Sequence, residues 1–128
     1  PTDTLAKSVS ENRLQPMLKA TPEIAKKFDE NSSLLELQFD SMYISLTGSN
    51  SPSGLASKPI RFLMMDEVDK YPGASSKEAD PIKLASERTK TFHNKKIYIT
   101  STPTLKTGHI WKEKEAADIE KHFFVPCT

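Results

Sequence analysis

The sequence predicts an α/β fold in which at least part of the sheet is parallel. From residue 60 onward, apolar runs typical of strands alternate with helical segments, an order characteristic of α/β proteins. The run Ile60–Met65 is apolar except for Arg61. An apolar run of this kind predicts a strand buried on both faces. Residues 68–95 are long enough for one crossover helix leading to the next parallel strand. With 128 residues, a single domain is expected.

Two helices and a hairpin are expected before this strand. Apolar residues recur at helical spacing over Asp3–Leu18, where Pro16 marks a kink or an end. A second short helix is predicted over Thr21–Phe28, because a capping threonine precedes a proline at the first helical position. Alternating apolar and polar residues over Leu34–Phe39 and Met42–Thr47 predict a two-stranded hairpin.

The rest of the chain is expected to alternate helices and strands. In chain order, capping and periodicity predict a short helix at Ser51–Ser57, a helix from Asp80 to about Phe92, a strand at Ile97–Thr100, a helix within Thr107–Glu120 and a short strand at His122–Val125. If the strands that begin at 60 and 97 are parallel, their carboxyl ends emerge at one edge of the sheet. In open α/β sheets that edge is where ligands bind.

Composition and charge exclude several classes of protein. Lys and Arg number 18 against 17 Asp and Glu, so the net charge of +1 gives no whole-chain attraction to nucleic acid or membranes. No apolar run approaches the roughly 18 residues of a membrane span, and no signal-peptide pattern is visible. The single cysteine, Cys127, has no intramolecular partner, which favours a reducing compartment. Without an initiator Met, we expect both ends to be cuts through a longer protein.

The strongest chemical signal is the pair Asp66 and Glu67, which directly follows the apolar strand. A strand ending at the edge of a dry sheet can present Asp66 to Mg²⁺, through water, against nucleotide phosphates. Glu67 is then placed to orient or deprotonate the water that attacks the γ-phosphate. This is the Walker B pattern with a catalytic glutamate; a solvated acidic turn is the plain alternative. Asp69 either caps the following loop or supports Glu67.

The second signal is a strand that ends in the small hydroxyl residues Thr100, Ser101 and Thr102. Ser101 and Thr102 can hydrogen-bond to the γ-phosphate, to its attacking water or to Glu67, and such a contact would report the state of the nucleotide. A Ser/Thr-Pro turn at the end of a strand is the common structural alternative. The pairing with Asp66 across one crossover helix favours the functional interpretation.

Asp66-Glu-Val-Asp69 and Thr100-Ser-Thr-Pro103 together resemble the core of the large terminase subunit of tailed bacteriophages. The similarity covers essentially the whole chain, in order, through Pro1–Ala6, Arg13–Met17, Gly48–Pro52, Leu55–Ser57, Pro59–Arg61, Asp80–Ile82, Arg88–Phe92 and Val125–Cys127. The resemblance implies a partial P-loop NTPase fold of the RecA/ASCE-like type, with a mostly parallel sheet flanked by helices. Residues 1–128 would be the C-terminal part of the ATPase domain.

The resemblance also implies an activity: an ATP-driven motor that packages viral DNA into an empty procapsid. Asp66 would then be the Mg²⁺ residue, Glu67 the catalytic carboxylate, and Thr100, Ser101 and Thr102 the coupling motif. The implied partners are double-stranded DNA, the portal and the small terminase subunit, with no membrane, in the host bacterial cytoplasm for a phage or prophage protein. Cys127 would be a zinc ligand in the parent protein.

The phosphate-binding loop of that family, the Walker A motif, is not found in this sequence. It has the form G-x-x-x-x-G-K-[ST] or a close variant, and none of the four glycines is followed by Lys. Without this loop, the chain has neither the cluster of backbone N–H groups nor the lysine that bind the β- and γ-phosphates. We therefore expect the chain alone to hydrolyse ATP negligibly, and the gap in its sheet to favour self-association. The Gly/Ser-rich segment Gly48–Gly54 is better explained as a connecting loop than as a phosphate cradle.

Two other classes of protein remain open. A helicase-like ATPase also carries Asp-Glu-Val-Asp followed by Ser-Thr as its second and third motifs, and a non-catalytic α/β interaction domain would use the acids only as a surface turn. A basic cluster is most simply a solvated helix end, although contact with DNA phosphates or a neighbouring subunit is a sharper alternative. Its members are Arg88, Lys90, His93, Lys95 and Lys96. A further alternative for Arg88 is an arginine that reaches the nucleotide of a neighbouring subunit.

Overall fold

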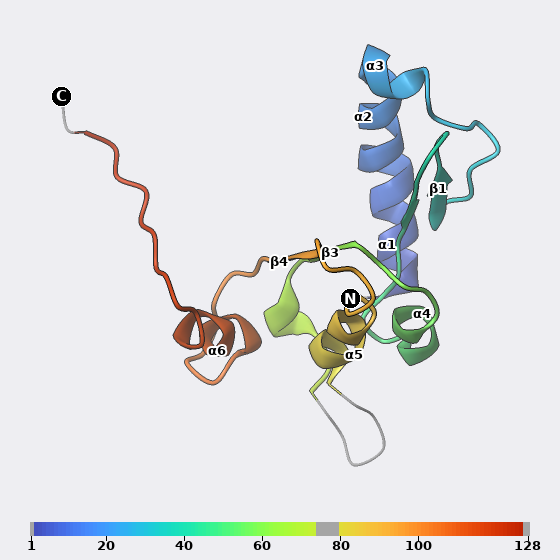
Figure 1. Ribbon diagram of the computed structural model, residues 1–128. Coiled ribbons are helices and arrows are strands. Elements are labelled where there is room, and N and C mark those ends of the chain that lie inside the picture. Colours follow the sequence, from blue (N-terminus) through green and yellow to red (C-terminus); the bar gives the residue numbers. More distant parts are fainter. Residues whose placement is uncertain (1, 74–79, 127–128) are drawn as a thin grey trace.

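The computed structural model describes residues 2–73 and 80–126. The described chain is mixed α/β, with helices around two separate two-stranded sheets (Figure 1). One sheet is an antiparallel hairpin and the other is a parallel pair. The predicted α/β class is therefore confirmed. The parallel strands lie where the sequence indicates them, but they form a small sheet of their own.

The N-terminal helical segment continues past Pro16 through a π-helical turn. It consists of α1 (Asp3–Val9), the π-helical segment η1 (Ser10–Leu14) and α2 (Gln15–Ala20). Thr2 caps it, with its side chain accepting from the Leu5 N–H at 3.3 Å. Proline has no N–H to donate, and its ring collides with the carbonyl four residues earlier in a regular helix. The wider π turn just before Pro16 lets the helix pass the proline without ending.

The hairpin predicted after this segment is confirmed. It pairs β1 (Glu36–Gln38) with β2 (Tyr43–Ser45), and the fully buried Leu37 lies opposite Ile44. The preceding helix α3 (Pro22–Ala25) is shorter than predicted. The backbone leaves the helix there because Phe28 forms a bridge with Phe39, and the two rings pack edge to face with centroids 5.5 Å apart.

The parallel pair consists of β3 (Phe62–Met65) and β4 (Lys96–Ile99). The Thr100 N–H donates to the Met65 carbonyl at 2.9 Å, and the Val68 N–H donates to the Thr100 carbonyl at 3.3 Å. These bonds continue the ladder past both strands. The carboxyl ends of β3 and β4 therefore emerge together, as the sequence predicts.

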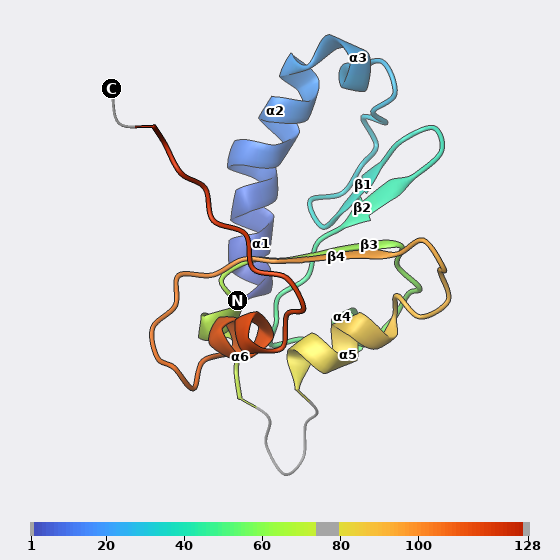
Figure 2. The same cartoon turned by 60° about the vertical axis from the view of Figure 1, so that its left-hand side comes forward.

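The core lies on one face of this pair. It contains Leu63, Met65, Val68, Ile82 and Ala85. Figures 1 and 2 show three helices on that side of the strands: α4 (Pro52–Ala56), α5 (Pro81–Glu87) and α6 (His109–Glu115).

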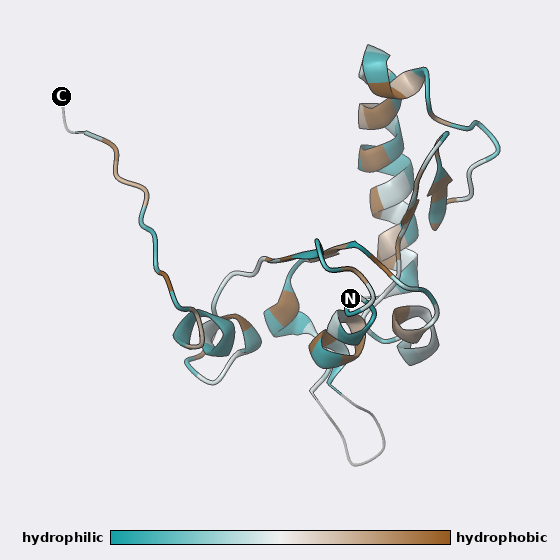
Figure 3. Cartoon of the chain, viewed as in Figure 1, coloured by the Kyte–Doolittle hydropathy of each residue, from teal (hydrophilic) through white to brown (hydrophobic). Residues whose placement is uncertain are grey.

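The other face of the pair is exposed, so the prediction of a strand buried on both faces is wrong. Met64 is 77% exposed and Phe62 48%, and Tyr98 on β4 is 51% exposed. Figure 3 shows hydrophobic residues along these strands, and no layer of the described chain covers this face. An apolar run indicates that both faces of a strand can be buried. It does not show that the chain supplies a second layer to cover the other face.

Two further elements differ from prediction. The helix α5 ends at Glu87, and the chain reaches Phe92 through tighter turns, in which the Thr89 hydroxyl donates to the Ser86 carbonyl at 2.8 Å. The strand predicted at His122–Val125 does not form, because this segment finds no strand to pair with in the described chain. It runs away from the other elements in Figure 1, and Phe123 is 93% exposed.

The last helix, α6, is shorter than the range Thr107–Glu120 that contains it. Trp111 lies on this helix, where its Nε1 donates to Glu115 Oε1 at 2.8 Å. The ammonium groups of Lys106 and Lys114 lie 5.8 and 5.1 Å from the centroid of its ring. Across the described residues, every helix falls short of the length and apolar character that crossing a bilayer requires.

Candidate functional site

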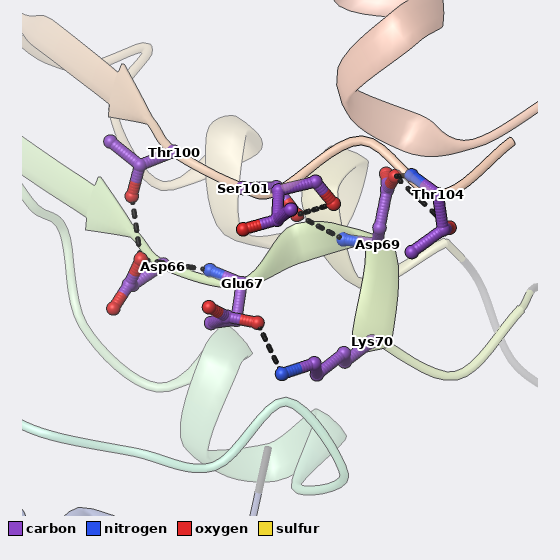
Figure 4. Close-up of polar contacts among 8 residues, drawn as sticks. Asp66, Glu67, Asp69, Lys70, Thr100, Ser101 and Thr104 are labelled. Atoms are coloured by element: carbon purple, nitrogen blue, oxygen red, sulfur yellow. Dashed lines mark hydrogen bonds and ion pairs between the residues drawn. The ribbon is translucent and has the colours of Figure 1, made fainter. Parts of the chain in front are cut away.

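Asp66 and Thr100 meet where β3 and β4 end (Figure 4). The Thr100 hydroxyl donates to Asp66 Oδ1 at 2.7 Å, and the Glu67 N–H donates to the same oxygen at 3.0 Å. The register explains this contact, because Met65 pairs with Ile99 and the next residue on each strand is again a neighbour. The structure thus brings the acid pair and the hydroxyl residues into side-chain contact through Thr100.

Within the described part of the chain, one oxygen of the Asp66 carboxylate accepts no hydrogen bond. Both hydrogen bonds of the carboxylate use Oδ1, and Figure 4 shows the other oxygen pointing away from Thr100. Within residues 2–73 and 80–126, no group of three or more His, Cys, Asp or Glu is arranged to hold a metal ion. Mg²⁺ on a nucleotide is usually held by one or two carboxylates together with waters and phosphates. One exposed carboxylate with a free oxygen fits that requirement.

Glu67 holds an unusual backbone conformation. Its φ of 58° and ψ of 41° are left-handed, and it is the one non-glycine residue with positive φ in the described part of the chain. This conformation turns the chain from β3 into the short 3₁₀ helix η2 (Val68–Lys70). Its carboxylate pairs with Lys70 Nζ at 2.6 Å, a bond that raises the pKa of Lys70 (Figure 4). Strained residues of this kind cost about 1–3 kcal/mol and cluster at functional sites.

Replacing Glu67 by glycine should give a more stable chain than replacing it by alanine. Both variants lose the pair with Lys70, but only glycine adopts φ 58° without a clash from Cβ. The free energy of unfolding, measured by urea denaturation, should favour Glu67→Gly over Glu67→Ala by about 1 kcal/mol. Equal stabilities would show that residue 67 is not left-handed in solution.

Asp69 joins the turn after β3 to the segment after β4. Its Oδ1 accepts from the Ile110 N–H at 2.9 Å, and its Oδ2 accepts from the Thr104 N–H at 3.2 Å. Its own N–H donates to Ser101 Oγ at 3.1 Å. The Ile110 bond, with a smaller contribution from Thr104, lowers the pKa of Asp69 below its ordinary value. Among the described residues, the carboxylate contacts match neither role left open by the sequence, because they lead to Thr104 and α6 and not to the loop after β3 or to Glu67.

Gly108 lies against this carboxylate. A Cβ at Gly108 would come within 2.6 Å of Asp69 Oδ2, so a larger residue would displace one of the two. This relation between Asp69 and Gly108 was not predicted from the sequence. The sequence shows only a glycine near the start of a predicted helix. A glycine at that position is compatible with several ways of capping the helix.

The other two residues of the predicted coupling motif, Ser101 and Thr102, are placed differently. The Ser101 hydroxyl faces Asp69, as described above, while its weak bond to the Thr102 carbonyl is 3.5 Å long. The described residues show no hydrogen bond from Ser101 or Thr102 to Glu67. The contact between the acid pair and the hydroxyl motif is therefore made by Thr100 in this structure.

Three other residues considered in the sequence analysis, Arg88, Lys90 and Gly48, contact parts of the chain other than Asp66 and Glu67. Arg88 Nη1 donates to the Ala56 carbonyl at 3.3 Å, which directs this side chain toward α4, and Lys90 pairs with Glu87 at 2.7 Å. The Gly48 N–H donates to Asp3 Oδ1 at 2.6 Å, which supports a connecting loop over a phosphate cradle. Cys127 lies outside the described residues.

Comparison with known proteins places the chain in a family. The family model described as the ATPase domain of the phage terminase large subunit gpA matches residues 1–128. Comparisons with curated proteins and with solved structures found no match. The chain therefore belongs to the family of ATPase domains of the phage terminase large subunit gpA.

Proposed function

We propose that this chain is part of an ATP-hydrolysing motor domain with a P-loop NTPase fold, which drives double-stranded DNA into a procapsid. The observation that carries the proposal is the contact of Asp66 with Thr100 at the carboxyl edge of two parallel strands. Family membership supports ATPase activity in the parent protein, with DNA, the portal and the small terminase subunit as partners, in the cytoplasm of the host bacterium.

In this proposal Asp66 is the residue that holds Mg²⁺. When bound, the metal ion neutralises charge on the β- and γ-phosphates. Thr100 and the Glu67 N–H fix the Asp66 carboxylate through Oδ1, so that its other oxygen would be left to hold the ion, directly or through water. Thr100 therefore acts by holding the orientation of Asp66.

Glu67 acts on the attacking water in this proposal. Its carboxylate must leave Lys70 to accept a proton or a hydrogen bond from that water. The pair with Lys70 is partly exposed, and such pairs contribute at most about 1 kcal/mol, so releasing Glu67 costs little. The left-handed backbone places the carboxylate on the turn, beyond the end of the strand.

Ser101 and Thr102 remain the proposed coupling residues. Thr102 is exposed, and its hydroxyl makes no hydrogen bond within the described residues, so it is free to contact the γ-phosphate. Ser101 holds the backbone of Asp69 and can pass a shift of β4 to the turn after β3. The chain supplies this half of the site, and a Walker A loop elsewhere in the parent protein would supply the grip on the phosphates.

The test is the Mg²⁺ dependence of ATP turnover by the complete large subunit that carries this chain. Asp66→Asn should lower turnover by on the order of a hundredfold and raise the Mg²⁺ concentration needed. Asp40→Asn, at an exposed turn of the hairpin, is the matched control and should match the wild type. Unchanged turnover and Mg²⁺ dependence in Asp66→Asn would refute the proposal. The 128-residue chain alone is expected to turn over ATP negligibly.

A further inference from the structure

We propose that Asp69 is a positioning residue that fastens α6 to the turn bearing Asp66 and Glu67, so that the turn and the helix move together as ATP is hydrolysed. This inference rests on the proposed function of Asp66 and Glu67. It assigns to the second aspartate of the Asp66–Asp69 motif a role in transmitting movement rather than in the chemical step.

The contacts of Asp69 reach two other parts of the chain, the segment after β4 and the helix α6. Its backbone N–H is held by Ser101, one residue beyond the Thr100 that contacts Asp66. Its two carboxylate oxygens accept from the backbone of Thr104 and from Ile110 in α6. Asp69 therefore lies between the end of β4 and the start of α6 and is bonded to both.

Gly108 makes this junction tight. The carboxylate of Asp69 occupies the place where a side chain at 108 would be, with Oδ2 only 2.6 Å from the ideal Cβ position. The N–H groups at the start of α6 have no side-chain cap from the residue just before the helix, because that residue is Gly108. Asp69 supplies the missing acceptor from a distant part of the chain.

The helix α6 has few other attachments to the fold. The Ile110 side chain packs against the core cluster of the β3–β4 pair, whereas Trp111 bonds to Glu115 within the helix. The residues that follow α6 are exposed. Movement of the turn after β3 would therefore reach α6 mainly through Asp69 and Ile110.

The movement of the turn after β3 would begin at Glu67. Glu67 is left-handed, and Asp69 follows two residues later in η2. A rotation about the Glu67 backbone as its carboxylate moves from Lys70 to water would carry Asp69 with it. The bonds from Thr104 and Ile110 would then transmit that rotation to α6.

The experiment measures ATP turnover and the length of DNA packaged per ATP with the complete large subunit. Asp69→Asn removes one acceptor, and Gly108→Ala crowds the same carboxylate from the other side. Each variant should reduce the length of DNA packaged per ATP by about tenfold.

ATP turnover should fall by less than about threefold in each variant. The double variant should be no worse than either single variant, because both break one contact. Asp118→Asn, an exposed carboxylate just past α6, is the matched control.

Hydrogen exchange of the same proteins tests the contact directly. Asp69→Asn should lose amide protection over residues 104–112, and Asp118→Asn should not. The inference is overturned if that protection is unchanged, if turnover and packaging fall in equal proportion, or if neither falls. Loss of turnover in Asp66→Asn is a separate result, so failure of the proposed function can be told apart from failure of this one.

Discussion

Glu67→Gln in the complete large subunit is expected to abolish most ATP hydrolysis while nucleotide binding is retained. Positioned general bases contribute roughly 10²–10⁴-fold to rate, and the amide of glutamine cannot accept the proton. Folding should be little affected, because the variant loses only a partly exposed pair with Lys70. Steady-state turnover and equilibrium binding of ATP measure the two effects separately.

Lys70→Gln is the matched control for this variant. It removes the same ion pair but leaves the Glu67 carboxylate in place, so turnover should change by less than about fivefold. If Glu67→Gln hydrolyses ATP as fast as the wild type, the acids form only a surface turn, as in the non-catalytic interaction domain. If both variants lose activity equally, the ion pair and not the base is what matters.

Met65→Ala should destabilise the 128-residue chain strongly, whereas Met64→Ala should not. Met65 is 4% exposed and packs in the core, and Met64, the next residue of β3, is 77% exposed on the uncovered face. Truncating a buried methionine to alanine costs about 2–5 kcal/mol, and exposed substitutions stay within about 0.5 kcal/mol. Urea denaturation of the two variants checks this difference. Equal losses of stability would mean that a second layer covers β3 in solution.

The sequence predicted the part of the site that follows from strand direction. A crossover of sufficient length between two apolar runs allows parallel strands, and parallel strands bring Asp66 and Thr100 to one edge. The partner of Asp69 was not predictable in the same way. Its bonds to Thr104 and Ile110 depend on how the chain folds back after β4, which no local pattern specifies.

The errors in the fold share a physical cause. Hydrophobic periodicity describes what a segment prefers, but burial and strand formation also need a partner. In the part of the chain that the structure describes, no layer covers Met64 and no strand lies beside the segment His122–Val125. Conversely, a kink or an end of the helix was expected at Pro16. The π turn before it accommodates the proline, so the helical hydrogen bonds on either side are kept.

The family assignment separates two of the classes that the motifs left open. Asp66–Asp69 followed by Ser101 and Thr102 suits a helicase-like ATPase as well as a terminase. The match over residues 1–128 places the chain with the terminase large subunit gpA. That assignment names the family, and the roles of individual residues depend on the variants described above.

The chain contains a built-in optical probe of α6. Trp111 is its single tryptophan, and it lies on the helix that Asp69 anchors, with lysine ammonium groups near its ring. The wavelength and intensity of indole emission depend on the polarity and charge around the ring. The fluorescence of the unlabelled chain therefore reports on one helix, and rearrangements of α6 can be followed in real time by stopped-flow mixing.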